Sequence, residues 1–493
     1  MNKRHFPFWP KRLPYNLVYP QTPVYEILET SARRYPEHTA IINYGQEISY
    51  GQLWDSARFL AGSLSRMGIS KGDRVGIYMQ NCPHYIVSYF AIMRANAVVV
   101  PLNPMLVENE LQKLIQDSGT KILITTTELF SGIQNNWKEL GVEDVIVGSL
   151  NDYLPDEPSV KTPDFMKQLP EIPADVHKWQ EVLDKREEPP EEAVTSDDLC
   201  LLPYTAGSTG TPKGCKHTHA TVISNVCSSA YWLYLTPGSI GLGCLPFFHV
   251  TGMVHAFLAP VFSGATNALM TRWDRETAMQ YIASYGVTHW VNITTMLIDT
   301  LNDPDFANRD LSSLMVVGGG GSPLPSALGE KFKEITGLDY VEGYGLTETI
   351  SQTHFNPPDR VKLGSIGIPD FGVDSRIVDP TTFEELGPEQ EGEIVLNGPE
   401  VFQGYWNKPE QTKESFLELE GKPFFRTGDI GKMDEEGYFY VIDRLKRMVN
   451  VSGFKVWPAK VESRLYNHLA VKECCIIGVP DTKQGETVRW SSF

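Results

Sequence analysis

Residues 204–214 read Tyr-Thr-Ala-Gly-Ser-Thr-Gly-Thr-Pro-Lys-Gly and continue an apolar run, 201–204, that predicts a short buried strand. Glycines let the backbone turn tightly and bring its N–H groups near an anion, hydroxyl groups donate further hydrogen bonds, and Lys213 adds a mobile positive charge. The stretch therefore predicts a phosphate-binding loop, with a Gly/Ser-rich surface turn as the alternative. It differs from the Walker loop, which ends in Gly-Lys-Ser/Thr, because Lys213 stands between Pro212 and Gly214.

On both sides of this loop, short apolar runs alternate with amphipathic segments. We predict strands at 40–42, 74–78, 97–100, 121–125, 287–292 and 314–321, and helices at 24–35, 50–67, 84–93, 220–233 and from Pro325 to Gly337. This alternation predicts an α/β fold with largely parallel sheets. From Gly364 the pattern changes to short β segments between Gly and Pro turns, which predicts a β-barrel-like subdomain.

The expected organisation is therefore α/β with three parts. A large N-terminal domain, 1–363, contains two parallel-type α/β-sheet subdomains with the nucleotide and acid sites. A small β-barrel-like subdomain follows over 364–443, and an incomplete α+β C-terminal lobe over 444–493.

Composition limits the partners. The chain has 493 residues, with 43 Lys and Arg against 61 Asp and Glu, a net charge of −18 that argues against a nucleic-acid partner. Any nucleotide pocket must therefore be locally positive. The seven cysteines have neither a zinc spacing nor a disulfide pattern. No apolar signal core or membrane-length segment is present in the sequence, so we expect a cytoplasmic protein.

The first 20 residues mix basic and aromatic side chains, which two arrangements explain. The segment could make a weak peripheral membrane contact, or it could be an extended arm packed on its own domain. Its four prolines argue against an amphipathic helix and favour the arm. The sequence leaves the oligomeric state open, a homodimer included.

Seven motifs in order, spanning about residues 22–490, resemble the adenylate-forming superfamily: acyl-CoA synthetases, aryl-CoA ligases, firefly luciferase and peptide-synthetase adenylation domains. They are the loop 204–214, Phe248-His249 with Gly252, 318–323, 344–348, 392–394, 426–429, and 443–453. Residues 442–454 are most similar to bacterial and archaeal long-chain fatty-acid-CoA ligases. The resemblance implies ATP, Mg²⁺ and coenzyme A. A carboxylic acid would form an acyl adenylate with release of pyrophosphate, and CoA would then form the thioester.

The resemblance also implies roles for individual residues. The loop would bind the β- and γ-phosphates, Thr347 the α-phosphate, and Glu348 the Mg²⁺, which typically takes one or two carboxylates plus phosphate oxygens. Tyr344 would lie against adenine. Asp429, supported by Arg444, would bind the ribose, because a carboxylate accepts two hydroxyl hydrogen bonds.

The resemblance also implies three sets of residues: those that bind the nucleotide, those that act in catalysis, and those that bind the acid and CoA. The implied nucleotide-binding residues are Thr205, Ala206, Gly207, Ser208, Thr209, Gly210, Thr211, Pro212, Lys213, Gly319, Gly320, Gly321, Ser322, Glu342, Gly343, Tyr344, Gly345, Thr347, Asp429 and Arg444. The implied catalytic residues are Lys213, His249, Thr347 and Glu348, with Glu348 as the metal ligand. The implied acid- and CoA-binding residues are His249, Val317, Gly318 and Gly453.

A lone histidine beside aromatic residues, such as His249, is more often a packed core residue than a catalyst. By resemblance it stands at the acyl and pantetheine entrance, where we expect it to position the substrate. Relatives that activate amino acids have an aspartate there, which argues against amino-acid activation. Gly318–Gly321 would leave room beside the carboxylate, or would simply form a close turn after a strand.

The end of the sequence departs from the family pattern. A lysine in a Pro-x-Gly-Lys type context near the end of the lobe is absent before Phe493. We therefore expect a shortened lobe that is poorly ordered or docked on the large domain, adenylation slowed by roughly 10²–10³-fold, and retained nucleotide binding.

The predicted function is a medium- to long-chain fatty-acid-CoA ligase. The alternatives are an aryl or short-chain acid-CoA ligase and a non-catalytic nucleotide or acyl-adenylate binding protein.

Overall fold

Two mainly parallel sheets organise the chain in the computed structural model, which describes residues 4–167, 171–205, 212–322, 324–451, 454–465, 468, 471, 474–481 and 485–492. The first sheet has the order β11 (His217–Thr218), β8 (Leu199–Leu201), β4 (Val98–Leu102), β3 (Arg74–Tyr78), β5 (Thr120–Thr126), β6 (Asp144–Gly148) and β7 (His177–Lys178). All neighbours are parallel except β11 and β8. The predicted strands at 74–78, 97–100 and 121–125 lie at its centre.

The second sheet has the order β18 (Ile368–Pro369), β17 (Ser351–Phe355), β16 (Tyr340–Leu346), β15 (Val316–Gly320), β14 (His289–Ile293), β12 (Ile240–Gly243), β13 (Thr266–Leu269), β1 (Thr39–Asn43) and β2 (Gln46–Ser49). Its six central strands, from β16 to β1, are parallel. The outer strands β2, β17 and β18 are antiparallel. The mainly parallel α/β architecture predicted from the sequence is confirmed.

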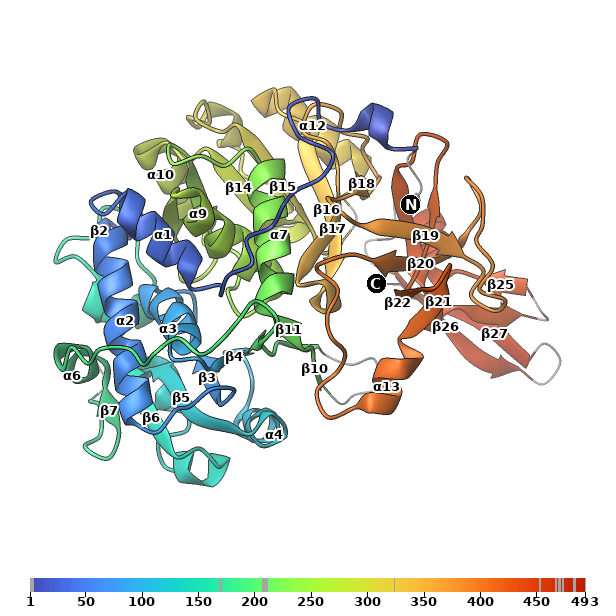
Figure 1. Ribbon diagram of the computed structural model, residues 1–493. Helices are drawn as coiled ribbons and strands as arrows, with labels where there is room; N and C mark the ends of the chain where they lie inside the picture. Colours follow the sequence, from blue (N-terminus) through green and yellow to red (C-terminus); the bar gives the residue numbers. More distant parts are fainter. Residues whose placement is uncertain are drawn as a thin grey trace.

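Helices cover and join these sheets (Figure 1). The main helices are α1 (Glu26–Arg34), α2 (Tyr50–Arg66), α3 (Pro83–Arg94), α4 (Glu108–Ser118), α6 (Trp179–Asp184), α7 (His219–Trp232), α9 (Ala259–Ser263), α10 (Arg275–Tyr285), α11 (Thr294–Leu301) and α12 (Ser326–Thr336). Ser49 and Gln52 form a capping box that starts α2. Gly337 ends α12 with φ +74°, as its sequence position predicts.

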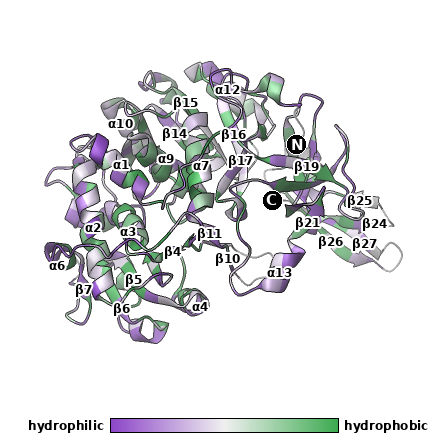
Figure 2. Ribbon diagram, viewed as in Figure 1, coloured by the Kyte–Doolittle hydropathy of each residue, from purple (hydrophilic) through white to green (hydrophobic). Residues whose placement is uncertain are grey.

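Helices α3 and α7 are buried almost throughout, and they share one core with strands of both sheets. A helix that is apolar around its circumference is expected in the interior of a large protein. Figure 2 shows the contrast with the outlying helices α6 and α13 (Pro409–Glu414), which are largely hydrophilic. The two sheets therefore form one body rather than two separate lobes.

A smaller antiparallel sheet follows, as the change of pattern after Gly364 predicts. Its order is β19 (Asp374–Val378), β20 (Gly392–Asn397), β22 (Lys422–Met433) and β21 (Phe416–Leu419), with β23 (Phe439–Arg444) paired to β22. This sheet has its own apolar core, to which Cys215 and Tyr405 contribute. Cys215 lies just after the predicted phosphate loop, so the small sheet packs against the segment that follows that loop.

The C-terminal residues form a four-stranded antiparallel sheet with the order β25 (Phe454–Val456), β24 (Val449–Val451), β27 (Gly485–Ser492) and β26 (Cys474–Asp481), together with α14 (Pro458–Leu465). Figure 1 places it beyond the small sheet, far from α2. The Ala459 N–H donates to Asp443 Oδ2 (2.7 Å), and Lys460 pairs with Glu391. These contacts join the C-terminal residues to the small sheet. Docking on the large domain stays a prediction.

The N-terminal arm packs on the protein itself, which is the arrangement that its prolines favour. Trp9 is 6% exposed, and its ring meets Trp232 and Phe371 edge-on at 5.1 Å. Phe8 contacts Tyr438 beside the small sheet. The arm therefore joins α7 to the small sheet. In the part of the chain that the structure describes, no helix is both long enough and apolar enough to cross a membrane.

Three local features escaped the sequence analysis. The apolar run 242–249 forms a strand only to Gly243, where β12 ends. A π-helix, η5 (Met253–Leu258), follows the short helix α8 (Val250–Gly252). The acidic stretch 155–190 contributes the edge strand β7 and helix α6 to the first sheet.

Candidate functional site

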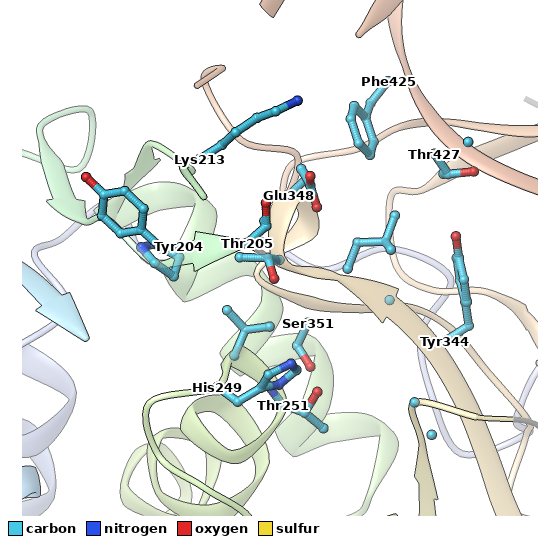
Figure 3. A pocket seen from close by; sticks show the side chains of 18 of the residues that line it. Tyr204, Thr205, Lys213, His249, Thr251, Tyr344, Glu348, Ser351, Phe425 and Thr427 are labelled. Atoms are coloured by element: carbon cyan, nitrogen blue, oxygen red, sulfur yellow. The ribbon is translucent and has the colours of Figure 1, made fainter. Parts of the chain in front are cut away.

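One large cavity, about 1230 Å³, brings most of the predicted site residues together. Its walls come from the hairpin of β9 (Tyr204–Thr205) and β10 (Lys213–Gly214), the end of β16, the helices α8 and η5, and the small sheet. Figure 3 shows Lys213 and Glu348 on one side and His249 and Thr251 on the other. We call these sides the phosphate end and the inner end.

The predicted phosphate loop begins and ends in this cavity. Strand β9 (Tyr204–Thr205) pairs antiparallel with β10 (Lys213–Gly214), so that Thr205 stands opposite Lys213. Thr205, Pro212 and Lys213 line the cavity. The other loop residues in the predicted set, Ala206, Gly207, Ser208, Thr209, Gly210 and Thr211, lie outside the described residues.

Tyr405 connects the loop lysine to the predicted metal ligand. The Lys213 ammonium lies 4.5 Å from the centre of the Tyr405 ring, and the Tyr405 hydroxyl donates to Glu348 Oε1 (2.8 Å). The sequence analysis did not identify Tyr405 as a functional residue. Tyr405 stands 57 positions after Glu348, so no local pattern joins the two residues. From the sequence, Gly404-Tyr405 was only one of the short β segments expected after Gly364.

Backbone hydrogen bonds fix Tyr405 in this position. Residues 403–406 run antiparallel to 214–216: the Gln403 N–H donates to Lys216 O, the Lys216 N–H to Gly404 O, and the Trp406 N–H to Gly214 O. The Phe402 N–H also donates to the Glu348 carbonyl (2.8 Å). The segment 402–406 is therefore joined both to the outgoing limb of the loop and to Glu348.

The residues at the phosphate end fit a hard divalent cation bound together with a phosphate. Among the described residues, no three His, Cys, Asp or Glu side chains gather as a metal-binding group. Glu348 contributes one carboxylate to the cavity lining beside Tyr405 and Lys213. Mg²⁺ needs no more than this, because it commonly keeps waters and takes its other ligands from substrate phosphates.

The predicted ribose-binding residues lie together beside β16, with Asp429 buried and the Arg444 side chain exposed. Asp429, which is 2% exposed, accepts a hydrogen bond from the Tyr344 hydroxyl (2.6 Å) and pairs with the Arg444 guanidinium (2.7 Å). Burial raises the pKa of Asp429, and the Arg444 charge partly offsets that effect. Tyr344 and Arg444 line the cavity, while Asp429 lies behind them. A ribose diol that bound Asp429 would therefore have to replace these partners.

The backbone around Thr347 is tied to the loop region. His217 Nε2 hydrogen-bonds the Thr347 carbonyl (2.8 Å). Burial lowers the pKa of His217 to about 4, so this ring is neutral at neutral pH and donates its single N–H to the carbonyl. Thr347, Gly343 and Gly345 all line the cavity.

Close packing between strands explains most of the glycine run in β15. A Cβ atom at Gly318, Gly319 or Gly320 would overlap a backbone carbonyl of a neighbouring strand. At Gly321, where φ is +88°, the nearest atom to such a Cβ would be 3.9 Å away. Gly319, Gly320 and Gly321 line the cavity. Close packing within the sheet therefore requires glycine at positions 318–320, independently of the room that these residues would leave for the acid.

Besides Asp429, four predicted residues lie outside the cavity lining: Val317, Gly318, Ser322 and Glu342. Val317 is buried in β15. Glu342 is 4% exposed and accepts from the Leu324 N–H (3.2 Å), and burial raises its pKa to about 7. Gly453 lies outside the described residues. Residues 444–447, which include the 3₁₀ turn η8 (Leu445–Arg447), close the cavity beside the small sheet.

His249 stands at the inner end as the N-cap of α8, with Nδ1 accepting from the Thr251 N–H (3.4 Å). Its ring is accessible from the cavity, yet the protein atoms around it lower its pKa by desolvation. The imidazole is therefore neutral at neutral pH. It is suited to positioning a substrate through one N–H or one lone pair.

Comparison with known proteins agrees with this geometry. The profile of the "AMP-binding enzyme" family matches residues 28–406. The chain is 35% identical to a long-chain-fatty-acid–CoA ligase of Bacillus subtilis, over 98% of this chain and 87% of that protein. It is 33% identical to a feruloyl-CoA synthase of an Amycolatopsis species, over 92% and 85%. The solved structure of ATP-bound MatB from Rhodopseudomonas palustris is similar, with a TM-score of 0.82 and 27% identity over 94% of this chain and 88% of that one. The chain therefore belongs to the AMP-binding enzyme family and is an AMP-forming acyl-CoA ligase that uses ATP, Mg²⁺ and CoA.

Proposed function

We propose that this ligase activates a fatty acid, of medium to long chain, through an acyl adenylate and transfers the acyl group to CoA. The observation that carries the proposed chemistry is the connected arrangement of Lys213, Tyr405 and Glu348 facing His249 across one cavity. The name of the Bacillus relative supports the class of acid.

The phosphate end addresses the main electrostatic problem of this reaction. A carboxylate must approach the α-phosphate of ATP, so two anions have to meet, and the site must neutralise both. Lys213 would pair with the phosphates, and the Thr347 hydroxyl would donate to the α-phosphate. Glu348 would bind Mg²⁺, which when present neutralises phosphate charge as pyrophosphate leaves.

The remaining residues would bind and orient the substrates. Tyr344 and the glycines on either side of it would contact adenine, and Asp429 with Arg444 would bind the ribose. His249, which is neutral, would orient the acid rather than remove a proton. Gly453 would act at the CoA step.

An aryl or short-chain acid is the second candidate, and one observation favours it. The inner end is closed by His255, Ser351, Gln352 and Phe355, and three of these four side chains are polar. The similarity to a feruloyl-CoA synthase supports the same alternative. A cytoplasmic location, a homodimer and a weak membrane contact of the arm stay predictions.

The test is pyrophosphate release with ATP, Mg²⁺, CoA and a series of acids from acetate to palmitate, with cinnamate added. Release should depend on the acid and fall strongly in Lys213→Ala and Glu348→Gln. Lys185→Ala and Glu37→Gln, at exposed positions outside the cavity lining, are matched controls. Release that is equal with and without acid, or unchanged in both cavity variants, would overturn the proposed chemistry. A preference for cinnamate or acetate would select the second candidate.

A further inference from the structure

The C-terminal end of helix α4 contacts the incoming limb of the phosphate loop. In the pairing of β9 with β10, Tyr204 on the incoming limb stands opposite Gly214 on the outgoing limb. The Tyr204 hydroxyl donates to Asp117 Oδ2 on α4 (2.6 Å). In Figure 3 this hydroxyl points away from Glu348 and His249. The incoming limb is therefore fixed by a residue that lies outside the cavity lining.

The outgoing limb reaches the same residue through Trp406. The backbone N–H of Trp406 donates to the Gly214 carbonyl (2.8 Å). The indole Nε1–H of Trp406 donates to the Asp117 carbonyl (3.0 Å). Asp117 therefore contacts the strand on each side of Gly214, which is the residue directly after Lys213.

The end of α4 supplies the acceptors for these contacts. The last carbonyl groups of an α-helix have no partner within the helix, and α4 ends at Ser118, before Gly119 in the left-handed conformation. The Asp117 carbonyl accepts from Trp406, and the Ser118 carbonyl accepts from Arg74 Nε (2.6 Å). The Arg74 guanidinium also lies 5.5 Å from the centre of the Trp406 ring. The indole is thus held at its N–H and at its ring.

This contact seats the loop on the first sheet. Tyr204 and Trp406 pack against the apolar core of that sheet, to which Leu114 of α4 belongs. Glu348, in contrast, follows β16 of the second sheet, in the 3₁₀ turn η7 (Thr347–Thr349). The position of Lys213 relative to Glu348 therefore depends on how the two limbs are held against α4.

Asp117 is unfavourable at this place on electrostatic grounds alone. A negative charge near the C-terminus of a helix opposes the helix dipole. The same charge repels a phosphate that approaches the loop. Burial, and the hydrogen bond to Asp117, raise the pKa of Tyr204, so the hydroxyl stays protonated and donates. This hydrogen bond is the favourable interaction that offsets both costs.

We propose that Asp117 is a positioning residue for ATP, which holds both limbs of the phosphate loop so that Lys213 meets the terminal phosphates. The inference rests on the proposed function, in which the loop binds the β- and γ-phosphates. Its effect should therefore be confined to ligands that carry those phosphates.

Binding of two nucleotides tests this role without turnover. Calorimetry would give the Kd of Mg²⁺-α,β-methylene-ATP, which cannot release pyrophosphate, and of AMP, which lacks the terminal phosphates. Asp117→Ala and Tyr204→Phe should each raise the Kd of the ATP analogue about tenfold, as expected for a lost hydrogen bond to a charged group. The Kd of AMP should change less than about twofold. Asp117→Asn keeps an acceptor for the hydroxyl and should lie between Asp117→Ala and the wild type.

A double variant tests whether the two side chains act through one hydrogen bond. Asp117→Ala combined with Tyr204→Phe should bind the ATP analogue no more weakly than the weaker of the two single variants. Trp406→Phe removes the indole donor on the other limb and should raise this Kd by about threefold or more. Asp144→Ala in β6 and Tyr440→Phe in β23, which remove similar hydrogen bonds outside the cavity lining, are matched controls and should leave both Kd values unchanged.

The outcomes separate this inference from the proposed function. Tighter or unchanged binding of the ATP analogue by Asp117→Ala would overturn the inference, because charge alone predicts tighter binding. Equal weakening of AMP, or an unchanged Kd in Tyr204→Phe or Trp406→Phe, would overturn it too. If Asp117→Ala does not fold, these two variants still decide. A Lys213→Ala variant with an unchanged Kd for the analogue would instead contradict the proposed phosphate site itself.

Discussion

The two ends of the cavity differ in how they use polarity. The phosphate end has charged groups, Lys213 and Glu348, connected through Tyr405, and it is assembled from the loop hairpin, the end of β16 and residues 402–406. The inner end has neutral buried groups that are held by α7 and β17. Charges suit the part of the reaction that is the same for every acid, and fixed neutral groups suit the part that varies. The two ends should therefore respond separately to mutation.

The largest expected effect tests that separation. Lys213→Ala should lower kcat/KM for ATP by roughly 10²–10³-fold, because it removes a charge that stabilises the transition state in a cavity partly shielded from water. The KM for the acid should change less than about twofold. Initial rates of pyrophosphate release, with ATP and acid varied in turn, measure both quantities.

Gln352→Leu should show the opposite pattern, with the KM for ATP retained and the discrimination between acids altered. Lys185→Ala and Gln180→Leu supply the controls. If each cavity variant changed the kinetic constants for ATP and for the acid in proportion, the two ends would act as one unit rather than separately.

Much of the α/β fold was predictable because its strands and helix ends depend on local sequence. Apolar runs predicted β3, β4 and β5 of the first sheet and β1, β14 and β15 of the second, and the predicted stop at Gly337 agrees with the end of α12. The cavity brings together both limbs of the phosphate loop, β16 and His249, which the family motifs had singled out. These features are encoded by short patterns with a direct physical meaning.

The missed features depend on contacts between distant segments or on unusual backbone. Tyr405 gains its position from pairing with residues 214–216, nearly 200 positions earlier. His249 and His255 are six positions apart, which in a regular α-helix would set them about 120° apart around the axis. His255 lies within the π-helix η5, whose i→i+5 hydrogen bonds change that phase, and both histidines line the cavity. Ser351 reaches the inner end of the cavity through a positive φ that its residue type does not predict.

The next expected effect is a loss of folding stability at low pH, caused by His255 at the inner end. The pKa of His255 is lowered by burial to about 4, from an ordinary value of 6.5, so between these values the unfolded chain binds a proton that the folded chain does not. The stability linked to His255 is thus complete above pH 6.5 and is lost as the pH falls toward 4. At pH 5 the loss is about 2 kcal/mol.

Urea titrations at pH 7 and pH 5, followed by tryptophan fluorescence, measure this effect. The wild-type protein should lose about 2 kcal/mol more than His255→Gln between the two pH values, since the variant lacks the titrating group. His38→Gln, at an exposed histidine, should behave as the wild type does. Equal losses in all three proteins would show that His255 is not a neutral buried ring.

The smallest expected effect tests the hydrogen bond between Tyr405 and Glu348 at the phosphate end. Tyr405→Phe keeps the ring beside Lys213 but removes the hydroxyl that donates to Glu348 Oε1. Partners that orient a metal ligand typically contribute tenfold or more to metal affinity, so the Mg²⁺ concentration for half-maximal rate should rise by about tenfold. The KM for the acid should not change. Tyr440→Phe, which breaks a similar hydrogen bond to Asp434 outside the cavity lining, is the matched control. A loss of thermal stability with an unchanged Mg²⁺ requirement would mean that Tyr405 only supports the fold. The predicted shift, with the acid KM unchanged, would instead show that one tyrosine positions the metal ligand without reaching the inner end.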